Sequence, residues 1–343
     1  MSAPESDIEG SAPRRLGFAG DVMLGRLVDR YQHSRPAAAV WDDLLPTLRT
    51  LDGLFVNLEC ALSTRGSEWT ETYRPFHFRA DPEWAIPALS LAGVDCCSLA
   101  NNHLLDFGPE ALADTLDHLD RAGIARVGAG RDRGEAFAPA VVSVRDLDVS
   151  VVSITDNTPE YAAGPDSPGV ARAEFDLSDE ESRSVLARAV DRALATDPDL
   201  LVASLHWGPN MVTEPPRRFR EVGRWLVERG ADVVHGHSAH VFQGVEIHRG
   251  RPILYDAGDF VDDYAVDETL RNDRSFLFEV RVRGDGTPVE LRLSPTEIAD
   301  CAVHPASEAA AAWSRERVAT LSRSLGTAFV EEDGALVTSL LGG

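Results

Sequence analysis

Short apolar runs alternate along the chain with amphipathic stretches that carry helix start and stop residues. Apolar runs bounded by glycine, proline or charged residues are typical of buried strands, whereas apolar residues spaced three and four apart predict helices. We predict strands at 16–20, 53–56, 94–100, 140–144, 149–154, 200–205, 232–234, 252–255, 276–282 and 289–293. We predict helices at 81–93, 108–123, 178–195, 216–230 and 307–326. This alternation indicates an α/β fold.

Local residues mark the ends of several of these elements. Ser178 and Glu181 form a capping box at the start of one helix, and Pro87 must bend or restart the helix at 81–93. Residues 1–15 are acidic and rich in serine and proline, so we expect a disordered tail there. No repeat or linker divides the rest. We expect one domain at 16–300, with a C-terminal helix and tail at 301–343 that packs on the same domain.

Charge and length narrow the possible partners. The 343 residues carry 56 acidic and 33 basic side chains, which gives a net charge of −23. This charge repels the phosphates of nucleic acids and of anionic membranes, so we expect neither as a partner. No apolar run of about 18 residues occurs, and the N-terminus does not resemble a signal peptide. We therefore expect a cytoplasmic protein, whose oligomeric state the sequence leaves open.

The composition also excludes several kinds of chemistry. Every basic residue is an arginine, since the chain contains no lysine. This excludes Schiff-base chemistry, a P-loop lysine and a carbamylated lysine between two metals. Cys60, Cys96, Cys97 and Cys301 form no Cys-x-x-Cys pair, so we expect neither a zinc ribbon nor a disulfide framework.

Several predicted strands stop at residues of metal-binding type. In an open α/β sheet, side chains beyond the carboxyl ends of neighbouring strands converge on one crevice, even from distant parts of the chain. The residues at these ends are Asp21; Asn57 and Glu59; Asn101, Asn102 and His103; His206; and His235, His237 and His240. A single one would be explained as a turn, a cap or a structural histidine, as we interpret the remaining histidines. Their repetition predicts one site.

The types of ligand indicate which ions this site would bind. Carboxylate, amide and imidazole groups without thiolates suit borderline and hard divalent cations. Their number exceeds what one catalytic ion with an open position takes. We therefore predict two divalent metal ions, Zn, Mn or Fe, which Glu59 or Asp21 could bridge.

A set of short segments follows the order of a known family. The segments are Gly20 to Arg26, Asn57 to Glu59, Ala100 to His103 with Asp106 and Gly108, His206 to Gly208, Gly236 to His240, and Tyr255 to Phe260. In them the chain resembles the CapA (poly-γ-glutamate capsule synthesis) family of the calcineurin-like metallophosphoesterase superfamily. The resemblance runs from about residue 16 to about residue 264 and does not cover the segment after Leu293.

The resemblance implies a fold and a role for each site residue. It implies a four-layer αββα sandwich of two mixed sheets flanked by helices, as in metallophosphoesterases. The implied metal ligands are Asp21, Glu59, Asn102, His206, His237 and His240. His103 is the implied catalytic acid, and Asp106 is close enough in sequence to orient its ring. The residues that we assign to substrate binding are Arg26 and Arg74, which could clamp a phosphate or carboxylate, and Asn57, Asn101 and Asp259.

The chain departs from the family pattern at three positions. The superfamily has a histidine where this chain has Met23, so we expect one metal site to be built differently. CapA-like proteins often have a histidine at the position of Ser238, and an asparagine at that of Asp259. The best-known capsule-synthesis members are anchored to the membrane, and this sequence shows no anchor.

Three hypotheses of function remain open. In the first, the protein is a metal-dependent hydrolase: a metal-activated hydroxide attacks a phosphate ester and His103 protonates the leaving oxygen. The second keeps the metals but places the reaction at a γ-glutamyl or related amide, whose carboxylates the arginines bind. In both, the partner is a small anionic substrate. The third is a non-catalytic component of polyglutamate assembly, which a basic groove or an anchor would favour.

Overall fold

A computed structural model describes residues 12–341, so most of the predicted tail lies outside the described residues. The last two residues of the predicted tail, Arg14 and Arg15, already belong to the first strand, β1 (Arg14–Val22). Arg14 and Arg15 pair with Val282 and Arg281 of an antiparallel neighbour. The guanidinium of Arg15 also forms an ion pair of 2.7 Å with Glu279. These contacts hold residues that composition alone assigned to a tail.

The larger sheet combines a parallel and an antiparallel part. On one side of β1 lie the parallel strands β2 (Gly53–Leu58), β5 (Cys96–Ser98) and β6 (Ala125–Val127). On the other side follow the antiparallel strands β16 (Arg274–Val282), β17 (Pro288–Ala299), β20 (Ala335–Ser339) and β19 (Val330–Glu332). Two further strands, β15 (Asp259–Val261) and β18 (Ala302–Pro305), pair with β1 and β17. The C-terminal segment therefore completes this sheet.

The second sheet has a parallel centre and an antiparallel strand at each edge. Its strands lie in the order β13 (Val245–His248), β14 (Arg251–Leu254), β12 (Val233–His237), β11 (Leu200–His206), β9 (Leu147–Thr155) and β8 (Ala140–Val144). The pairs β14–β12, β12–β11 and β11–β9 are parallel. Two small two-stranded pairs complete the strands: β3 (Ala61–Leu62) with β4 (Arg79–Ala80), and β7 (Ala129–Gly130) with β10 (Gly169–Val170).

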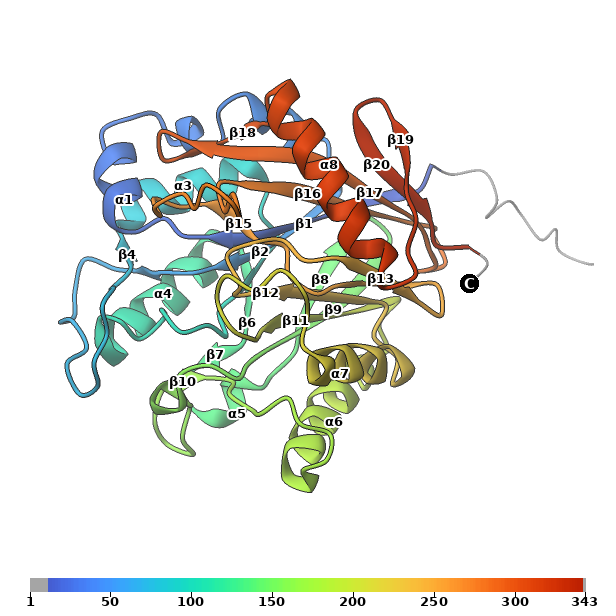
Figure 1. Cartoon of the computed structure of the whole chain (residues 1–343). Helices are drawn as coiled ribbons and strands as arrows, with labels where there is room; N and C mark the ends of the chain where they lie inside the picture. Colours follow the sequence, from blue (N-terminus) through green and yellow to red (C-terminus); the bar gives the residue numbers. More distant parts are fainter. Residues whose placement is uncertain (1–11, 342–343) are drawn as a thin grey trace, which may run out of the picture.

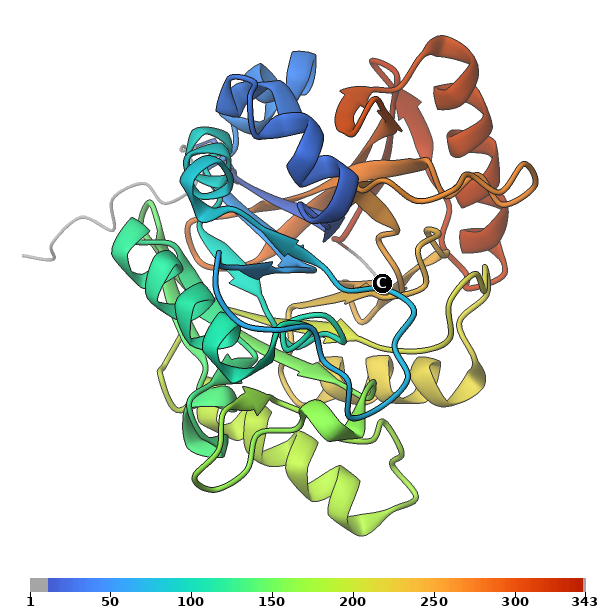
Figure 2. The ribbon, with the colours of Figure 1, turned by 90° about the vertical axis from the view of Figure 1, so that its left-hand side faces the viewer.

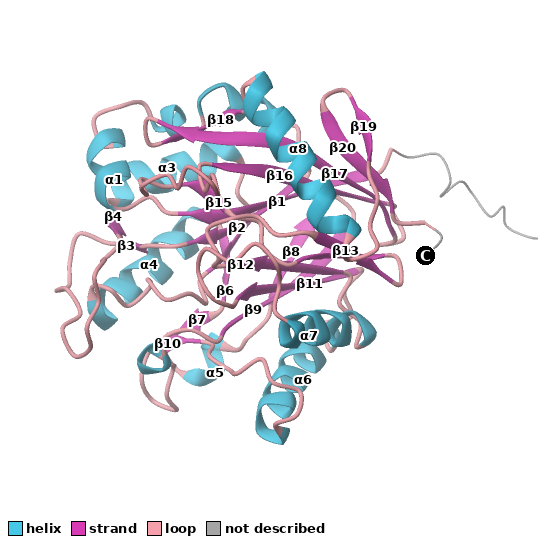
Figure 3. Cartoon of the chain, viewed as in Figure 1, coloured by secondary structure: helices cyan, strands magenta, loops and turns pink. Residues whose placement is uncertain are grey.

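The two sheets lie face to face, with helices outside both of them (Figures 1 and 3). The core between the sheets joins side chains such as Phe18 and Phe55 of the large sheet to Val151 and Val202 of the second. The outer face of the large sheet is covered by α1 (Arg26–Gln32), α2 (Leu45–Leu48), α3 (Pro82–Ala92) and α4 (Gly108–Ala122). The outer face of the second sheet is covered by α6 (Glu180–Leu194) and α7 (Arg217–Glu228). The predicted four-layer αββα sandwich is confirmed.

Shorter elements join these layers. The helix α8 (Glu308–Arg323) contributes Val318 and Leu321 to the core between the sheets. The remaining helical turns are α5 (Arg133–Ala136) and the 3₁₀ segments Ala37–Val40, Asp42–Leu44 and Pro159–Tyr161. No helix within residues 12–341 is both long and apolar enough to cross a membrane.

Some predicted boundaries change for local reasons. The strand predicted at 94–100 is only Cys96–Ser98, because the amide of Asn101 turns back to the carbonyl of Leu99. The helix at 82–92 runs through Pro87 without a restart. The strand predicted at 232–234 extends to His237, since its residues pair with the neighbouring strand β11 as far as His206, where β11 ends.

The capping residue of α6 also differs from the prediction. Ser178 was predicted as the cap with Glu181, but the side chain of Asp179 accepts the hydrogen bond from the amide of Ser182, at 2.7 Å. The hydroxyl of Ser178 is used elsewhere, because it donates to Asp176. The helix therefore starts one residue later than the capping box would place it.

Candidate functional site

Potential ligand side chains gather where strands of both sheets end. Asp21 of β1 pairs in register with Asn57 of β2 on one side and with Asp259 of β15 on the other. In the second sheet, His206 at the end of β11 pairs with His237 at the end of β12. The Nδ1 of His237 lies 3.8 Å from the Oδ1 of Asp21, so the ends of the two sheets meet. The structure thus brings together residues that the sequence selected at separate strand ends.

Two glycines allow the backbone to approach these strand ends. A Cβ on Gly20 would lie 1.8 Å from the carbonyl oxygen of Gly258, and one on Gly236 would lie 2.1 Å from that of Tyr255. Both clashes are with backbone that has no room to move. Each glycine directly precedes a potential ligand, Asp21 or His237, and the amide of Asp21 donates to the carbonyl of Gly258 at 3.0 Å. Glycine is therefore required before both ligands by close packing of the backbone.

The first donor group consists of Asp21, His206 and His237, whose ligand atoms all lie within 4.8 Å of one another. The Nε2 of His206 lies 2.9 Å from the Oδ1 of Asn102, and the Nε2 of His237 lies 3.0 Å from the hydroxyl of Ser204. When each Nε2 donates its proton, the two Nδ1 atoms, which lie 2.9 Å apart, both carry lone pairs and neither can donate to the other. A cation there would satisfy both rings.

The second donor group consists of Asp21, His240 and Asp259. The Nδ1 of His240 lies 2.9 Å from the Oδ1 of Asp259 and 3.5 Å from the Oδ2 of Asp21. Asp21 is therefore common to both donor groups, and it is one of the two residues predicted as able to bridge a pair of cations. Met23 takes no part, because it is fully buried in the apolar core.

The structure places Asp259, which the sequence assigned to substrate binding, among the potential metal ligands. Its side chain is fully buried, and its Oδ2 has no hydrogen-bond partner among the described residues. It belongs to the second donor group, in which its ligand atom lies within 4.8 Å of those of Asp21 and His240. The position of Asp259 therefore suits a ligand better than a contact to substrate.

Burial shifts the protonation of the whole cluster. It raises the pKa of Asp21 to about 6. It also raises the pKa of Asp259 well above its ordinary value, with further contributions from the charges of Asp262 and Asp21. Burial lowers the pKa of His206 and of His237, and it lowers that of His240 to about 3. The three histidines are therefore neutral at pH 7 and provide no positive charge to the neighbouring carboxylates. Carboxylates in such surroundings favour the binding of cations.

The loop that carries His240 has an unusual backbone. Ser238 and His240 adopt positive φ angles of 117° and 59°, which cost free energy for residues other than glycine. The carboxylate of Asp256 holds the loop in place, because it accepts hydrogen bonds from the amides of Ala239 and Gly258 at 2.7 and 2.8 Å. This strained turn directs the ring of His240 toward Asp21.

His103 is held firmly beside the donor groups. Its Nδ1 lies 2.6 Å from the Oδ2 of Asp106, whose carboxylate also accepts hydrogen bonds from the amide of Phe78 and the hydroxyl of Tyr161. The ring stacks on that of Phe78, with centroids 3.8 Å apart. When the Nδ1 of His103 donates to Asp106, its Nε2 accepts a hydrogen bond from the side-chain Nδ2 of Asn102 at 3.1 Å. The Nε2 is thus the atom of His103 that faces the site.

Asn57 and Asn101, which the sequence assigned to substrate binding, are both fully buried behind the ligands. The Nδ2 of Asn57 donates to Asp21 at 2.7 Å and to Glu59 at 2.9 Å. Asn101 donates to the Oδ1 of Asn57, and its own Oδ1 accepts from the amide of His103. In this structure they hydrogen-bond to carboxylates and to His103, and neither lines the cavity over the site; their assignment to substrate binding stays a prediction.

Glu59 lies next to the site but outside both donor groups found among the described residues. Its Oε1 is buried, has no hydrogen-bond partner there, and lies 3.9 Å from the Nε2 of His103. Burial and the charge of Asp21 raise its pKa well above the ordinary value. This buried carboxylate oxygen without a partner remains available to a cation.

Three buried serines behind the first donor group were missed by the sequence analysis. The hydroxyl of Ser98, from the large sheet, lies 2.5 Å from that of Ser153 and 2.9 Å from that of Ser204, both in the second sheet. Ser204 in turn contacts the rings of His235 and His237. In the sequence these serines are ordinary small residues within apolar strands, so no pattern could distinguish them.

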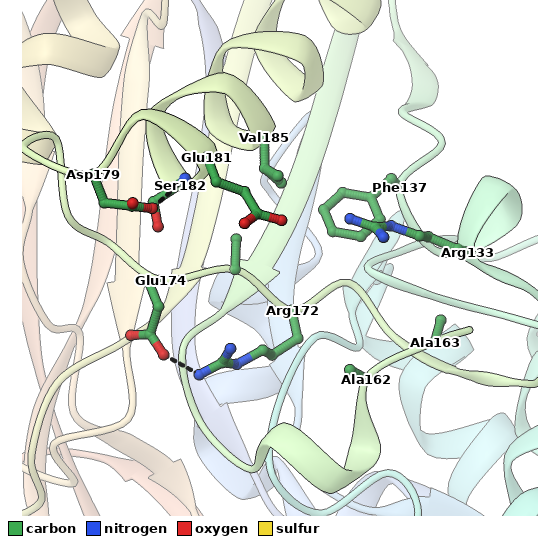
Figure 4. Close-up of a pocket in the computed structure, with 11 residues that line it drawn as sticks. Arg133, Phe137, Ala162, Ala163, Arg172, Glu174, Asp179, Glu181, Ser182 and Val185 are labelled. Atoms are coloured by element: carbon green, nitrogen blue, oxygen red, sulfur yellow. Dashed lines mark hydrogen bonds and ion pairs between the residues drawn. The ribbon is translucent and has the colours of Figure 1, made fainter. Parts of the chain in front are cut away.

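A cavity of about 490 Å³ opens over the site and is lined on one side by Asn102, His103 and His240. Both arginines predicted to bind substrate, Arg26 and Arg74, also line it. A separate cavity of about 350 Å³ lies between α5, α6 and the segment around Arg172 (Figure 4). None of the predicted site residues lines that second cavity.

Comparison with known proteins agrees with this arrangement of motifs. Residues 15–264 match the model of the family described as "Bacterial capsule synthesis protein PGA_cap". The chain is 32% identical to a probable polyglutamine synthesis accessory protein of Mycobacterium tuberculosis, over 90% of this chain and 91% of that one. It is 27% identical to the capsule biosynthesis protein CapA of Bacillus anthracis, over 95% and 77%. A crystal structure of the protein TT1561 from Thermus thermophilus aligns with a TM-score of 0.42 and 11% identity, over 83% and 99%.

Proposed function

The chain belongs to the bacterial capsule synthesis (PGA_cap, CapA) family, and from this premise we propose that it is a metal-dependent hydrolase that acts on a phosphate ester. One observation carries the proposal: two donor groups share Asp21 beside the hydrogen-bonded pair His103–Asp106. Paired cation sites next to an oriented histidine suit hydrolysis of an anionic ester.

The proposed cofactor is a pair of divalent cations. Asp21, His206 and His237 would hold one ion and Asp21, His240 and Asp259 the other. The unpartnered oxygens of Asp21, Asp259 and Glu59 are buried, so the residues present fit such ions. When bound, divalent cations supply charge neutralisation for the substrate and lower the pKa of a water molecule near it.

His103 and the two arginines have distinct tasks in this proposal. Arg26 and Arg74 bind the anionic substrate from the cavity wall. Water adds to phosphorus and gives up a proton to the solvent, the bond from phosphorus to the ester oxygen breaks, and that oxygen takes a proton from the Nε2 of His103, which the solvent then reprotonates. The carboxylate of Asp106 orients the ring and stabilises its protonated form. The products are the free alcohol and phosphate.

The test combines metal analysis with a panel of phosphomonoesters and phosphodiesters. We expect bound divalent metal in the purified protein, and turnover that falls by about 10²–10⁴-fold in His103→Gln. The metal content of this variant should stay unchanged, because His103 lies in neither donor group. His33→Gln is the control, since the side chain of His33 is 53% exposed. Normal turnover in His103→Gln, or no ester hydrolysis by the metal-loaded protein, would contradict the proposal.

A second candidate keeps the same site and changes the bond that is cleaved. Two relatives are named for polyglutamine synthesis and for capsule biosynthesis. The two arginines suit carboxylates as well as phosphates. This candidate is hydrolysis or transfer at a γ-glutamyl or related amide. Release of glutamate or amine from γ-glutamyl compounds, with all phosphate esters left intact, would select it.

A further inference from the structure

The cavity over the site has an apolar wall next to the donor groups. Apart from the site residues, its lining includes Phe76, Phe78, Met211 and Tyr264. Sugars and polyglutamate chains need hydrogen-bond partners along their whole length, and this wall supplies few. Of the polar residues on it, Asn272 already donates to the carbonyl of Ala265 and accepts from the amide of Asp267. The wall is therefore suited to an apolar group.

The segment between β3 and β4 builds this wall and places it against the catalytic pair. It crosses the front of the molecule in Figure 2, where it is drawn in blue. Phe78 is anchored, because its amide donates to Asp106 and its ring stacks on His103. The ring of Phe76 lies 6.4 Å from that of Phe78, nearly parallel to it, yet Phe76 remains 51% exposed. A large apolar ring is thus left open at the cavity, beside the ring on which His103 rests.

The two arginines leave donors available beside this wall. The guanidinium of Arg26 stands 4.9 Å from the ring centre of Phe76, and its nearest carboxylate oxygen is that of Asp263, at 3.4 Å. The guanidinium of Arg74 contacts Glu160 and the carbonyl of Asn102, but its buried Nε has no hydrogen-bond partner among the described residues. Cationic and aromatic groups therefore lie side by side in one cavity.

The position of His103 identifies which part of the substrate meets the wall. The group that protonates a leaving oxygen must lie beside the leaving group, and Phe78 stacks on the ring of His103. We propose that this cavity binds the leaving group and that the natural substrate is a phosphate ester of an apolar, ring-bearing alcohol. The inference rests on the proposed function and specifies its substrate class. Phe76 is the residue that determines this specificity.

The experiment measures binding of two stable phosphonates to the Mn²⁺-loaded full-length protein by calorimetry. Phenylphosphonate and methylphosphonate present the same anion and differ in the ring, and neither can be hydrolysed. We expect phenylphosphonate to bind at least about tenfold more tightly, which is the range expected for a ring stacked in an aromatic pocket. In Phe76→Ala this ratio should fall toward one, because the phenyl ring loses its aromatic partner.

Tyr73→Ala is the matched control, because Tyr73 belongs to the same segment, is 92% exposed and does not line the cavity. It should keep the ratio of the parent protein. Equal binding of the two phosphonates, or a ratio that Phe76→Ala leaves unchanged, would overturn the inference. Tighter binding of γ-glutamyl oligomers than of phenylphosphonate, independent of Phe76, would also overturn it and favour an acidic chain.

Failure of this inference is separable from failure of the proposed function. Hydrolysis of phosphate esters together with equal phosphonate affinities overturns the substrate class alone. A preference for phenylphosphonate that depends on Phe76, in a protein that hydrolyses no ester, supports the cavity and overturns the hydrolase. Binding of neither phosphonate overturns the inference as well.

Discussion

At the scale of single residues, the site depends on which nitrogen of each histidine is free. Ser204 contacts the Nε2 of His237 at 3.0 Å, and Asn102 contacts the Nε2 of His206 at 2.9 Å. Partners of this kind fix the tautomer of a ligating imidazole and orient its ring. The buried hydroxyls of Ser98 and Ser153 hold Ser204 in turn. The serines therefore support the first donor group through His237.

Ser204→Ala tests this indirect role. Removal of the hydroxyl frees the ring of His237 to change tautomer, so we expect the affinity for a divalent cation to fall by about 10–100-fold. Competition with a chelator measures it. Ser150→Ala is the control, because Ser150 is also buried in β9 but its hydroxyl has no hydrogen-bond partner among the described residues. An unchanged metal affinity in Ser204→Ala would show that the serines only fill space.

At the scale of elements, strand ends position the potential ligands, and helix caps set where individual helices start. The potential ligands lie at the ends of β1, β11 and β12 because parallel strands place their carboxyl ends at the same edge. The helices cover the outer faces and leave this edge open (Figure 1). Single side chains cap the starts of two of these helices, Asp81 for α3 and Asp179 for α6.

The cap of α6 gives a prediction at this scale. Asp179→Ala removes the acceptor of the amide of Ser182, so we expect the melting temperature to fall by about 1–2 °C. Ser178→Ala, at the position that the sequence favoured, should change it less, because that hydroxyl contacts Asp176 and not the helix. Thermal unfolding followed by circular dichroism compares the two. A larger effect of Ser178→Ala would restore the predicted capping box.

At the scale of the whole molecule, packing two sheets face to face concentrates buried acidic groups at one edge. Asp21, Asp256 and Asp259 are all buried there, and burial raises the pKa of each. Such groups destabilise a protein at neutral pH unless a cation compensates them. A bound cation also stabilises the folded state by mass action. Binding of a divalent cation at this edge would therefore stabilise the folded protein.

Asp259→Asn separates these two effects. The pKa of Asp259 is raised in the folded protein, so its contribution to stability is present at low pH and is lost as pH rises above about 4, its unfolded value. Asparagine does not ionise and keeps an oxygen for His240. In EDTA at pH 8 we expect the variant to melt higher by about 2 °C, and the gain should be smaller at about pH 4.5, close to that unfolded value. In Mn²⁺ the order should reverse, because a donor is lost.

Asp333→Asn is the control for this comparison, since Asp333 is 98% exposed in the turn before β20. Its melting temperature should follow that of the parent protein at both pH values. A variant Asp259→Asn that is less stable than the parent in EDTA at pH 8 would show that the carboxylate is compensated within the protein. Both melting curves are measured with and without EDTA in the same buffer.

Several features of this protein were determined by its sequence alone. Apolar runs and helix stop residues are local properties, so they predicted most strands and helices and the α/β class. The positions of Asp21, His206 and His237 at strand ends were readable for the same reason. Parallel strands share one edge whatever their register, so His206 and His237 were expected to lie together. Asp21 belongs to the other sheet and reaches them only through the packing of the two sheets.

Only the tertiary structure decided which residues contact these potential ligands. Asn102 and His206 are 104 positions apart and meet through the packing of two sheets, which no local pattern encodes. The same holds for Asn57, which supports carboxylates, and for Asp259, which joins the second donor group. The apolar wall at Phe76 depends on the path of a long segment across the strand ends. Such contacts are set by register and packing between distant segments, whereas composition and periodicity report only on neighbours along the chain.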